Sequence, residues 1–219
     1  MAFKPLKKTV RDLLEQGEID RVAEMAVSKR RVLGSLVSLS FDSDPEIAWR
    51  AIEASGASAR LIVRKDPNTI NEHLRRILWL VTEESGGICW HAPELMAEIL
   101  AQLPGQFTDY VPIAASFLVT LEEEDLEHFR PGALWAIGRL GELAREQHSE
   151  LVPAVAAALE NPDPQARGMA VWCLGQIERP DLLSDRPELL TDDGPVDLYQ
   201  ERTLSRTTVG ELAERAGGA

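Results

Sequence analysis

Apolar residues recur at helical spacing along most of the chain, and residues 133–144 show the pattern clearly. Their apolar side chains fall three or four positions apart, which predicts a helix with one apolar face. These residues are Ala133, Leu134, Ala136, Ile137, Leu140, Leu143 and Ala144. Trp135 lies beside this face rather than on it. The alternation typical of a sheet is absent until late in the chain, so the sequence predicts an all-α architecture.

Helix starts are marked by prolines that follow a short residue. In three cases this residue is aspartate, which can accept hydrogen bonds from the first backbone amides of a helix. Proline fits the first helical position because it has no amide hydrogen to satisfy there. The four pairs are Asp44-Pro45, Asp66-Pro67, Ala92-Pro93 and Asp163-Pro164. Each proline is therefore predicted to begin a helix rather than to break one.

A repeated segment organises the predicted helices. It consists of alanine, a β-branched apolar residue, two variable residues, one further residue and glycine, and it occurs at residues 51–56, 136–141 and 170–175. Residues 95–100 keep its apolar positions but end in leucine. The four segments end at positions 56, 100, 141 and 175, which are 44, 41 and 34 residues apart. Repeats of this period predict stacked pairs of helices.

A second repeated segment supports the first. The stretches YVPIAASFL (residues 110–118) and LVPAVAAAL (residues 151–159) lie 41 residues apart, and in each the Val-Pro pair falls 11 residues after the end of the first segment. Each unit is therefore predicted to contain two helices. One helical pair cannot bury both of its faces, whereas a stack of pairs can.

The stretches DPEIAWRAIEASG (residues 44–56) and NPDPQARGMAVWCLGQI (residues 161–177) resemble HEAT-type repeats, in particular the short HEAT-like repeats of phycobilin lyases. The resemblance covers roughly residues 10–178. It implies an α-α superhelix, a right-handed HEAT-like solenoid of about four to five helix pairs. The family includes lyases, hydroxylases, nucleic-acid enzymes and adaptors, so the resemblance implies the fold more specifically than the function.

The first unit lacks the clear repeat signature, as terminal units of solenoids often do. Thr9 and Asp12 are spaced as a capping pair and predict a helix start, and Gly17 predicts the end of that helix. Ser28 is placed to cap a helix over residues 29–40.

The last part of the chain changes character. Its apolar residues are arranged around a polar Gln-Glu-Arg turn, which predicts a short β-hairpin, and Thr208 with Glu211 is spaced as a capping box for a final helical turn. The apolar residues of this segment are Val196, Leu198, Tyr199, Leu204 and Val209. The sequence predicts a solenoid domain over residues 1–192 and a hairpin segment over residues 193–219. The hairpin either covers the apolar end of the stack or offers an edge to a partner strand.

Charge and composition narrow the functional classes. The 219-residue chain has a formal net charge of −13, which opposes binding to a phosphate backbone, so no nucleic-acid partner is expected. The basic run Lys29-Arg30-Arg31 is interpreted as the solvated first turn of a helix. No run of about 18 apolar residues predicts a membrane span, and the N-terminal stretch lacks the apolar core of a secretory signal. A cytoplasmic location without membrane association is the expectation.

The stretch at residues 82–99 holds the residues that suggest chemistry. Its simplest interpretation is a corner in which glycines end one helix and a proline begins the next. Cys89 and His91 lie two residues apart and are candidates for a thiol-imidazole catalytic pair, although no third group to orient them is apparent. His91, Glu94 and Glu98 would line one helix face and are candidates for metal ligands. No cofactor motif is present, and no cofactor is expected.

The resemblance also implies a partner surface, because the second helices of HEAT-type pairs line the concave side. Here these would be the helices over residues 67–84 and 108–121. The predicted partner-binding residues are His73, Arg76, Glu83, Trp90, Tyr110 and Ser116. The sequence therefore favours a non-enzymatic scaffold or adaptor that binds a protein or peptide on its concave surface. The alternative is an enzyme or cofactor-handling protein, lyase-like or metal-dependent, that uses the corner from Gly86 to Glu98.

Overall fold

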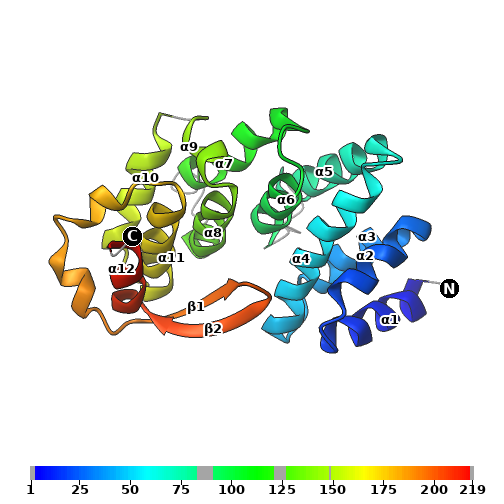
Figure 1. Cartoon of the computed structure of the whole chain (residues 1–219), viewed down its shortest axis with the longest axis horizontal. Helices are drawn as coiled ribbons and strands as arrows, with labels where there is room; N and C mark the ends of the chain where they lie inside the picture. The colour runs from blue at the N-terminus through cyan, green and yellow to red at the C-terminus, as the bar shows by residue number, and fades with distance from the viewer. Residues whose placement is uncertain (1–2, 83–90, 121–126, 148, 218–219) are drawn as a thin grey trace. The chain divides into compact units, whose positions relative to one another are not determined.

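The structure is a computed structural model that describes residues 3–82, 91–120, 127–147 and 149–217. Within these residues lie twelve α-helices, five short 3₁₀ helices and one pair of antiparallel strands (Figure 1). The prediction of a helical-repeat protein with a C-terminal hairpin is confirmed. The chain divides into two compact units, Met1–Phe107 and Thr108–Ala219. Across the described ranges, no helix is long and apolar enough to cross a membrane.

The described part of the first unit is built around one long central helix. Its helices are α1 (Phe3–Glu15), α2 (Ile19–Ser28), α3 (Arg31–Leu39), α4 (Pro45–Ile62), α5 (Pro67–Thr82) and α6 (Ala92–Ala101). The central helix, α4, packs against α2, α3 and α6 and is buried along most of its length. Its alanine, serine and glycine side chains are small, so the neighbouring helices approach it closely.

Helices α4 and α6 approach each other at Gly56. A Cβ atom at this position would lie 2.8 Å from the Glu98 Cγ atom and 2.9 Å from the Glu98 carbonyl oxygen. Real Cβ atoms essentially never approach other atoms this closely. The glycine that ends the first copy of the repeated segment is therefore required by helix packing.

The second unit is centred on two long helices and carries the hairpin. Its elements are η1 (Thr108–Tyr110), α7 (Val111–Thr120), η2 (Glu127–Phe129), α8 (Arg130–Leu140), α9 (Glu142–Arg145), α10 (Leu151–Ala157), η3 (Ala158–Glu160), α11 (Pro164–Gln176), η4 (Pro180–Leu183), η5 (Pro187–Thr191), β1 (Pro195–Gln200), β2 (Thr203–Thr208) and α12 (Val209–Gly217). Helix α8 packs against α7 and α11, and α11 also contacts α12 and β1. Because neighbours cover α8 on more than one side, Trp135 is only 4% exposed although it lies beside the predicted apolar face.

The prediction of one continuous apolar face over residues 133–144 is wrong at its end. Helix α8 stops at Leu140, and Gly141 has a positive φ of 59° before the short helix α9 begins. A residue with positive φ, which glycine adopts without strain, ends the helix here and breaks its register. Leu143 therefore does not extend the buried face and is 41% exposed, whereas Ala144 is buried.

The predicted helix starts are confirmed where aspartate precedes proline. Helices α4, α5 and α11 begin at Pro45, Pro67 and Pro164. The side chains of Asp44 and Asp163 each accept a 3.0 Å hydrogen bond from the amide two residues further on. Helix α6 also begins beside its proline, although its N-cap makes no side-chain hydrogen bond. These caps satisfy amides that the first helical turn leaves without a partner.

Two predicted caps in the first unit are wrong. Helix α1 begins six residues before Thr9, so Thr9 and Asp12 lie inside it, and the Thr9 hydroxyl donates to a carbonyl oxygen of the preceding turn. Ser28 is the last residue of α2, and its hydroxyl donates to the Met25 carbonyl oxygen. It therefore does not cap the next helix, α3, which begins at Arg31. Threonine and serine make such bonds within helices as readily as they cap them. The predicted stop at Gly17 is confirmed by its position after α1 and its φ of 75°.

The predicted hairpin is confirmed, and its turn is tighter than the sequence suggests. Two residues, Glu201 and Arg202, connect β1 to β2 with φ values of 51° and 65°. Two-residue turns of this kind suit the twist of paired strands, although they usually use asparagine and glycine. The predicted capping box is also present, because Thr208 and Glu211 bond each other's amides at 3.2 and 3.3 Å.

Side chains of the helical part hold the outer edge of β1. The Gln165 carboxamide bonds the Asp197 amide at 2.8 Å and the Asp197 carbonyl oxygen at 2.9 Å. The Trp135 indole donates to the Tyr199 carbonyl oxygen at 3.0 Å. The hairpin is thus joined to α8 and α11 by hydrogen bonds as well as by apolar packing.

Candidate functional site

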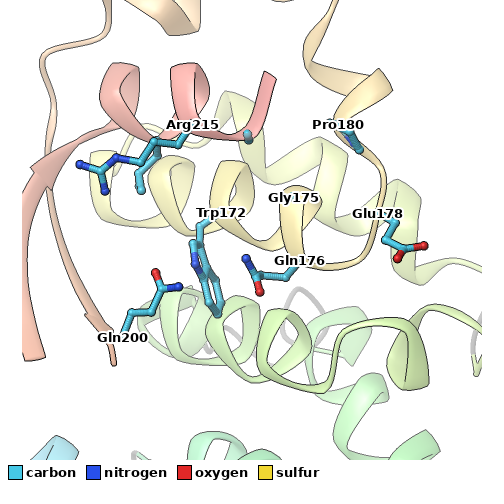
Figure 2. A pocket seen from close by; sticks show the side chains of 9 residues that line it. Trp172, Gly175, Gln176, Glu178, Pro180, Gln200 and Arg215 are labelled. Atoms are coloured by element: carbon cyan, nitrogen blue, oxygen red, sulfur yellow. The ribbon is translucent and has the colours of Figure 1, made fainter. Parts of the chain in front are cut away.

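A pocket of about 510 Å³ lies in the second unit, where α11 meets α12 and the end of β1 (Figure 2). Trp172 on α11 and Leu212 on α12 give it apolar walls. Polar groups come from Gln176, from Gln200 at the end of β1 and from Arg215. A mostly apolar cavity with a few polar groups is the usual form of a ligand site.

The Trp172 side chain, which lines this pocket, has a buried hydrogen-bond donor without a partner. The residue is 8% exposed, and its indole nitrogen has no hydrogen-bond partner within the described residues. The neighbouring Trp135 differs, because its indole donates to a backbone carbonyl. The two rings stack with centroids 6.3 Å apart and planes inclined by 11°. Stacking restrains the Trp172 ring, so its buried and unpaired N–H group has a fixed position in the wall of the pocket.

Gly138 makes room for this ring. A Cβ atom at Gly138 would lie 2.4 Å from the Trp172 Cζ3 atom. The side chains of Gln200 and Gln176 flank the Trp172 ring in Figure 2. Their carboxamides can donate and accept, so the pocket offers an indole donor between two adaptable polar groups. Such an arrangement suits a ligand that presents a hydrogen-bond acceptor, such as an amide carbonyl group.

The charged side chains at this pocket already form ion pairs with neighbouring residues. The Arg215 guanidinium lies 3.8 Å from the Glu211 carboxylate, and the Glu178 carboxylate lies 3.4 Å from the Arg145 guanidinium. Arg215, Glu211 and Glu178 are largely exposed, so each pair adds little stability and can rearrange around a ligand. The Trp172 indole is therefore the distinctive polar group of the pocket.

The structure places part of the predicted corner site in the first unit. His91 precedes α6, and its Nδ1 atom lies 2.9 Å from the Glu94 Oε1 atom. Glu94 is 2% exposed, and its Oε2 atom has no hydrogen-bond partner in the described part of the chain. The Trp49 ring lies beside His91 with centroids 6.0 Å apart. Cys89, the other half of the predicted catalytic pair, lies outside the described residues.

The His91–Glu94 pair predicts a pH dependence. Burial opposes the charged ring, but the charge of Glu94 and its hydrogen bond outweigh this effect, so the pKa of His91 is raised. A raised pKa in the folded state means that the pair stabilises the fold below the ordinary histidine pKa, and that this contribution is lost as pH rises through the raised value. An NMR titration of His91 should give a pKa above 6.5, and Glu94→Gln should lower it. Glu142→Gln is the matched control, and an equal effect of both variants would contradict this origin of the shift.

Three candidate metal ligands, His91, Glu94 and Glu98, do not converge. No group of three histidine, cysteine, aspartate or glutamate residues within the described ranges is arranged to hold a metal ion. Glu98 instead lies against Gly56 and accepts a hydrogen bond of 3.1 Å from the Gln102 amide group. Cys173, the cysteine that the structure describes, is a free and fully buried thiol whose burial raises its pKa. Burial of this kind disfavours a reactive thiolate.

The predicted partner-binding residues fall in different environments. On α5, His73 is buried and Arg76 is exposed, while Tyr110 and Ser116 near α7 are half-buried. Glu83 and Trp90 lie outside the described residues. The residues predicted from the sequence to bind a partner did not include Trp79, which is 62% exposed on α5. Its position three residues after Arg76, on the same helix face, is the signal that could have identified it.

Comparison with known proteins bears on the second unit. A family model described as a HEAT-like repeat matches residues 127–177, which run from η2 through α8 to the end of α11. No curated protein and no solved structure matches the chain. The more specific resemblance to phycobilin-lyase repeats stays a prediction. The matched segment contains both Trp135 and Trp172, so the indole of the candidate pocket lies within it. Residues 127–177 are thus similar to a HEAT-like repeat.

Proposed function

We propose that the chain is a non-enzymatic helical-repeat scaffold that binds a protein or peptide partner. The HEAT-like repeat supports this proposal, because such repeats commonly mediate protein interactions. Stacked helical pairs expose long surfaces that suit extended partners.

The observation that carries the proposal is the unpaired indole N–H of Trp172 at the pocket of the second unit. A buried polar group without a partner costs about 1–3 kcal/mol, and a bound acceptor would recover much of that cost. A peptide presents a carbonyl group at every residue. One peptide carbonyl accepts from the Trp172 indole, and an adjoining apolar side chain packs against Leu212 and Pro180, which also line the pocket.

A second contact region is proposed on α5, as the sequence predicts for the concave surface. The exposed Trp79 and the exposed Arg76 support it, because tryptophan and arginine contribute disproportionately to binding energy at protein interfaces. A separate contact region is proposed in the second unit, where the sequence also predicts partner binding at Tyr110 and Ser116, and both residues are half-buried there.

Peptide selection from a random library tests the proposed function. The wild-type protein should enrich a defined set of peptides, and Trp172→Phe should weaken their binding by roughly three- to tenfold, since one neutral hydrogen bond is lost. An aromatic ring that can stack on Trp135 is kept in this variant. Fluorescence polarisation with an enriched peptide measures the dissociation constant.

Two controls accompany this measurement. Trp49→Phe changes a tryptophan that lies outside the pocket and outside the proposed contact regions, and it should leave the affinity of a pocket-bound peptide unchanged. His91→Ala, at the corner favoured by the alternative enzymatic function, should do the same. If no peptide is enriched, or if all three variants bind equally well, the Trp172 pocket is not a peptide site.

The alternative function as an enzyme or cofactor-handling protein rests on the unpaired Glu94 Oε2 atom beside His91. Tight binding of a metal ion or a tetrapyrrole by the purified protein, lost in both Cys89→Ala and His91→Ala, would favour it over the scaffold.

A further inference from the structure

A basic pocket lies in the first unit between the start of α3 and the first half of α5. Its cavity measures about 450 Å³ and is lined by Arg30, Arg31 and Arg76, together with the buried ring of His73. One acidic residue, Glu72, also lines it. The lining thus carries a net positive charge in a chain whose formal net charge is −13.

His73 distinguishes this pocket from an ordinary basic surface. The side chain is 6% exposed, and its Nε2 atom has no hydrogen-bond partner within the described ranges. Burial, together with the charge of Arg76, lowers the pKa of His73 to about 4. The ring is therefore neutral at pH 7 and offers a hydrogen bond rather than a charge. An unpaired polar atom in such a place is unfavourable unless a ligand bonds to it.

The available donors are side chains rather than the start of helix α3. The amides of Val32 and Leu33 already bond to carbonyl oxygens of the residues before the helix. The Thr69 hydroxyl, which also lines the cavity, donates to the Asp66 carboxylate at 2.5 Å. The Arg30 guanidinium donates one hydrogen bond of 3.3 Å to the Ala26 carbonyl oxygen. A guanidinium group has five N–H donors, so others remain for a ligand.

We propose that this pocket binds a phosphate group, either as free inorganic phosphate or as the phosphorylated side chain of a partner protein. The planar guanidinium groups of arginine match the geometry of phosphate oxygens and bond them in pairs. A phosphate group carries about 1.5 to 2 negative charges at neutral pH, which suits the three arginines that line the pocket. His73 donates its Nε2 hydrogen to a phosphate oxygen on the buried side of the site. Glu72 repels the anion and limits its affinity.

This site is separate from the peptide pocket at Trp172 and does not depend on it, because each lies within its own unit. The basic run at residues 29–31, interpreted from the sequence as a solvated helix start, supplies two of the arginines. The other two residues, His73 and Arg76, come from the helix that the sequence assigns to partner binding.

Isothermal titration calorimetry of the full chain tests the proposal with three probes. These are sodium phosphate, a short peptide with one phosphoserine and the same peptide without phosphate, all at an ionic strength fixed with sodium chloride. We expect saturable binding of both phosphate-bearing probes and none of the plain peptide. Tighter binding of the phosphopeptide identifies a phosphorylated protein as the source of the group, and tighter binding of inorganic phosphate identifies the free anion. Either result supports the site.

Charge variants locate the binding. Arg76→Gln should weaken it by roughly tenfold, since a hydrogen bond between charged groups is lost. Arg75→Gln, at the exposed neighbouring position outside the pocket, should change it less than twofold. Glu72→Gln should strengthen it severalfold because it removes a repulsive charge. Arg75, Arg76 and Glu72 are all exposed, so their variants are expected to remain folded.

His73→Leu separates the buried imidazole from the general charge of the pocket. It should weaken phosphate binding severalfold while leaving the three arginines in place. The proposal is overturned if neither phosphate probe binds, if the plain peptide binds as well as the phosphopeptide, or if Arg75→Gln weakens binding as much as Arg76→Gln. It is also overturned if duplex DNA binds with the same dependence on Arg76 while both phosphate probes fail.

Discussion

Replacing Trp135 with alanine is expected to lower the free energy of unfolding by about 3–5 kcal/mol, the cost of removing a large aromatic side chain from a core. Trp135 is 4% exposed, stacks on Trp172 and donates a hydrogen bond to the Tyr199 carbonyl oxygen. The substitution removes all three interactions at once. Urea unfolding followed by circular dichroism measures the change.

Two further variants separate these contributions. Trp135→Phe keeps an aromatic ring but loses the indole donor, and it should cost less than Trp135→Ala. Trp79→Ala removes a tryptophan that is 62% exposed and should change the free energy of unfolding by no more than about 0.5 kcal/mol. A loss of stability in Trp79→Ala as large as that in Trp135→Ala would contradict the exposed position of Trp79, and a negligible loss in Trp135→Ala would contradict the packing described for α8 and α11.

Gly56→Ala is expected to lower the free energy of unfolding by about 1–3 kcal/mol, the usual cost of overfilling a well-packed core. The new methyl group would lie 2.9 Å from the Glu98 carbonyl oxygen, and a backbone atom cannot rotate away. Helices α4 and α6 must therefore move apart. Alanine normally favours a helix over glycine by about 1 kcal/mol, so a net loss would show that packing outweighs propensity.

Gly175→Ala is the matched control for this substitution. Gly175 also lies in a helix and also ends a copy of the repeated segment, but a Cβ atom there would lie 3.4 Å from the nearest atom, the Ala216 Cβ. The same change of residue should be neutral or stabilising at this position. Thermal unfolding of both variants compares them directly, and equal destabilisation would contradict the role given to Gly56.

The sequence predicted the fold well where local chemistry decides it. An aspartate before a proline favours a helix start through the cap bond and the fixed φ of proline, and α4 and α11 begin as predicted. The capping box at Thr208 and Glu211 is likewise a local pattern, and its hydrogen bonds are present. Thr9 shows the limit of this reasoning. Its hydroxyl donates to a carbonyl oxygen within α1, and the spacing of polar residues in the sequence does not distinguish such a bond from an N-cap.

The repeated glycines show why one pattern can hide several physical causes. Gly56 allows two helices to approach, whereas Gly141 ends α8 through its positive φ, and Gly175 has ordinary space around it. Periodicity located all three positions but could not distinguish these roles. The exposure of Leu143 follows directly from the second role, because a helix that ends cannot continue its apolar face.

The candidate pockets could not be predicted because they bring together distant residues. Trp172 and Gln200 meet only when the hairpin folds onto α11, whereas Arg30 precedes α3 and His73 lies on α5. An unpaired indole or imidazole nitrogen is also a property of the packed structure, since every polar atom is solvated in the unfolded chain. The sequence did supply the individual residues His73 and Arg76, although not the cavity that joins them.

The side chains along β1 have a consequence for the behaviour of the protein at high concentration. A two-stranded sheet has two open sides, and an open side can recruit a strand from another molecule and start the growth of aggregates. Gln165 occupies the backbone groups of Asp197, and Trp135 occupies the carbonyl group of Tyr199. Because these backbone groups are already hydrogen-bonded, the outer side of β1 is protected against the addition of a strand from another molecule.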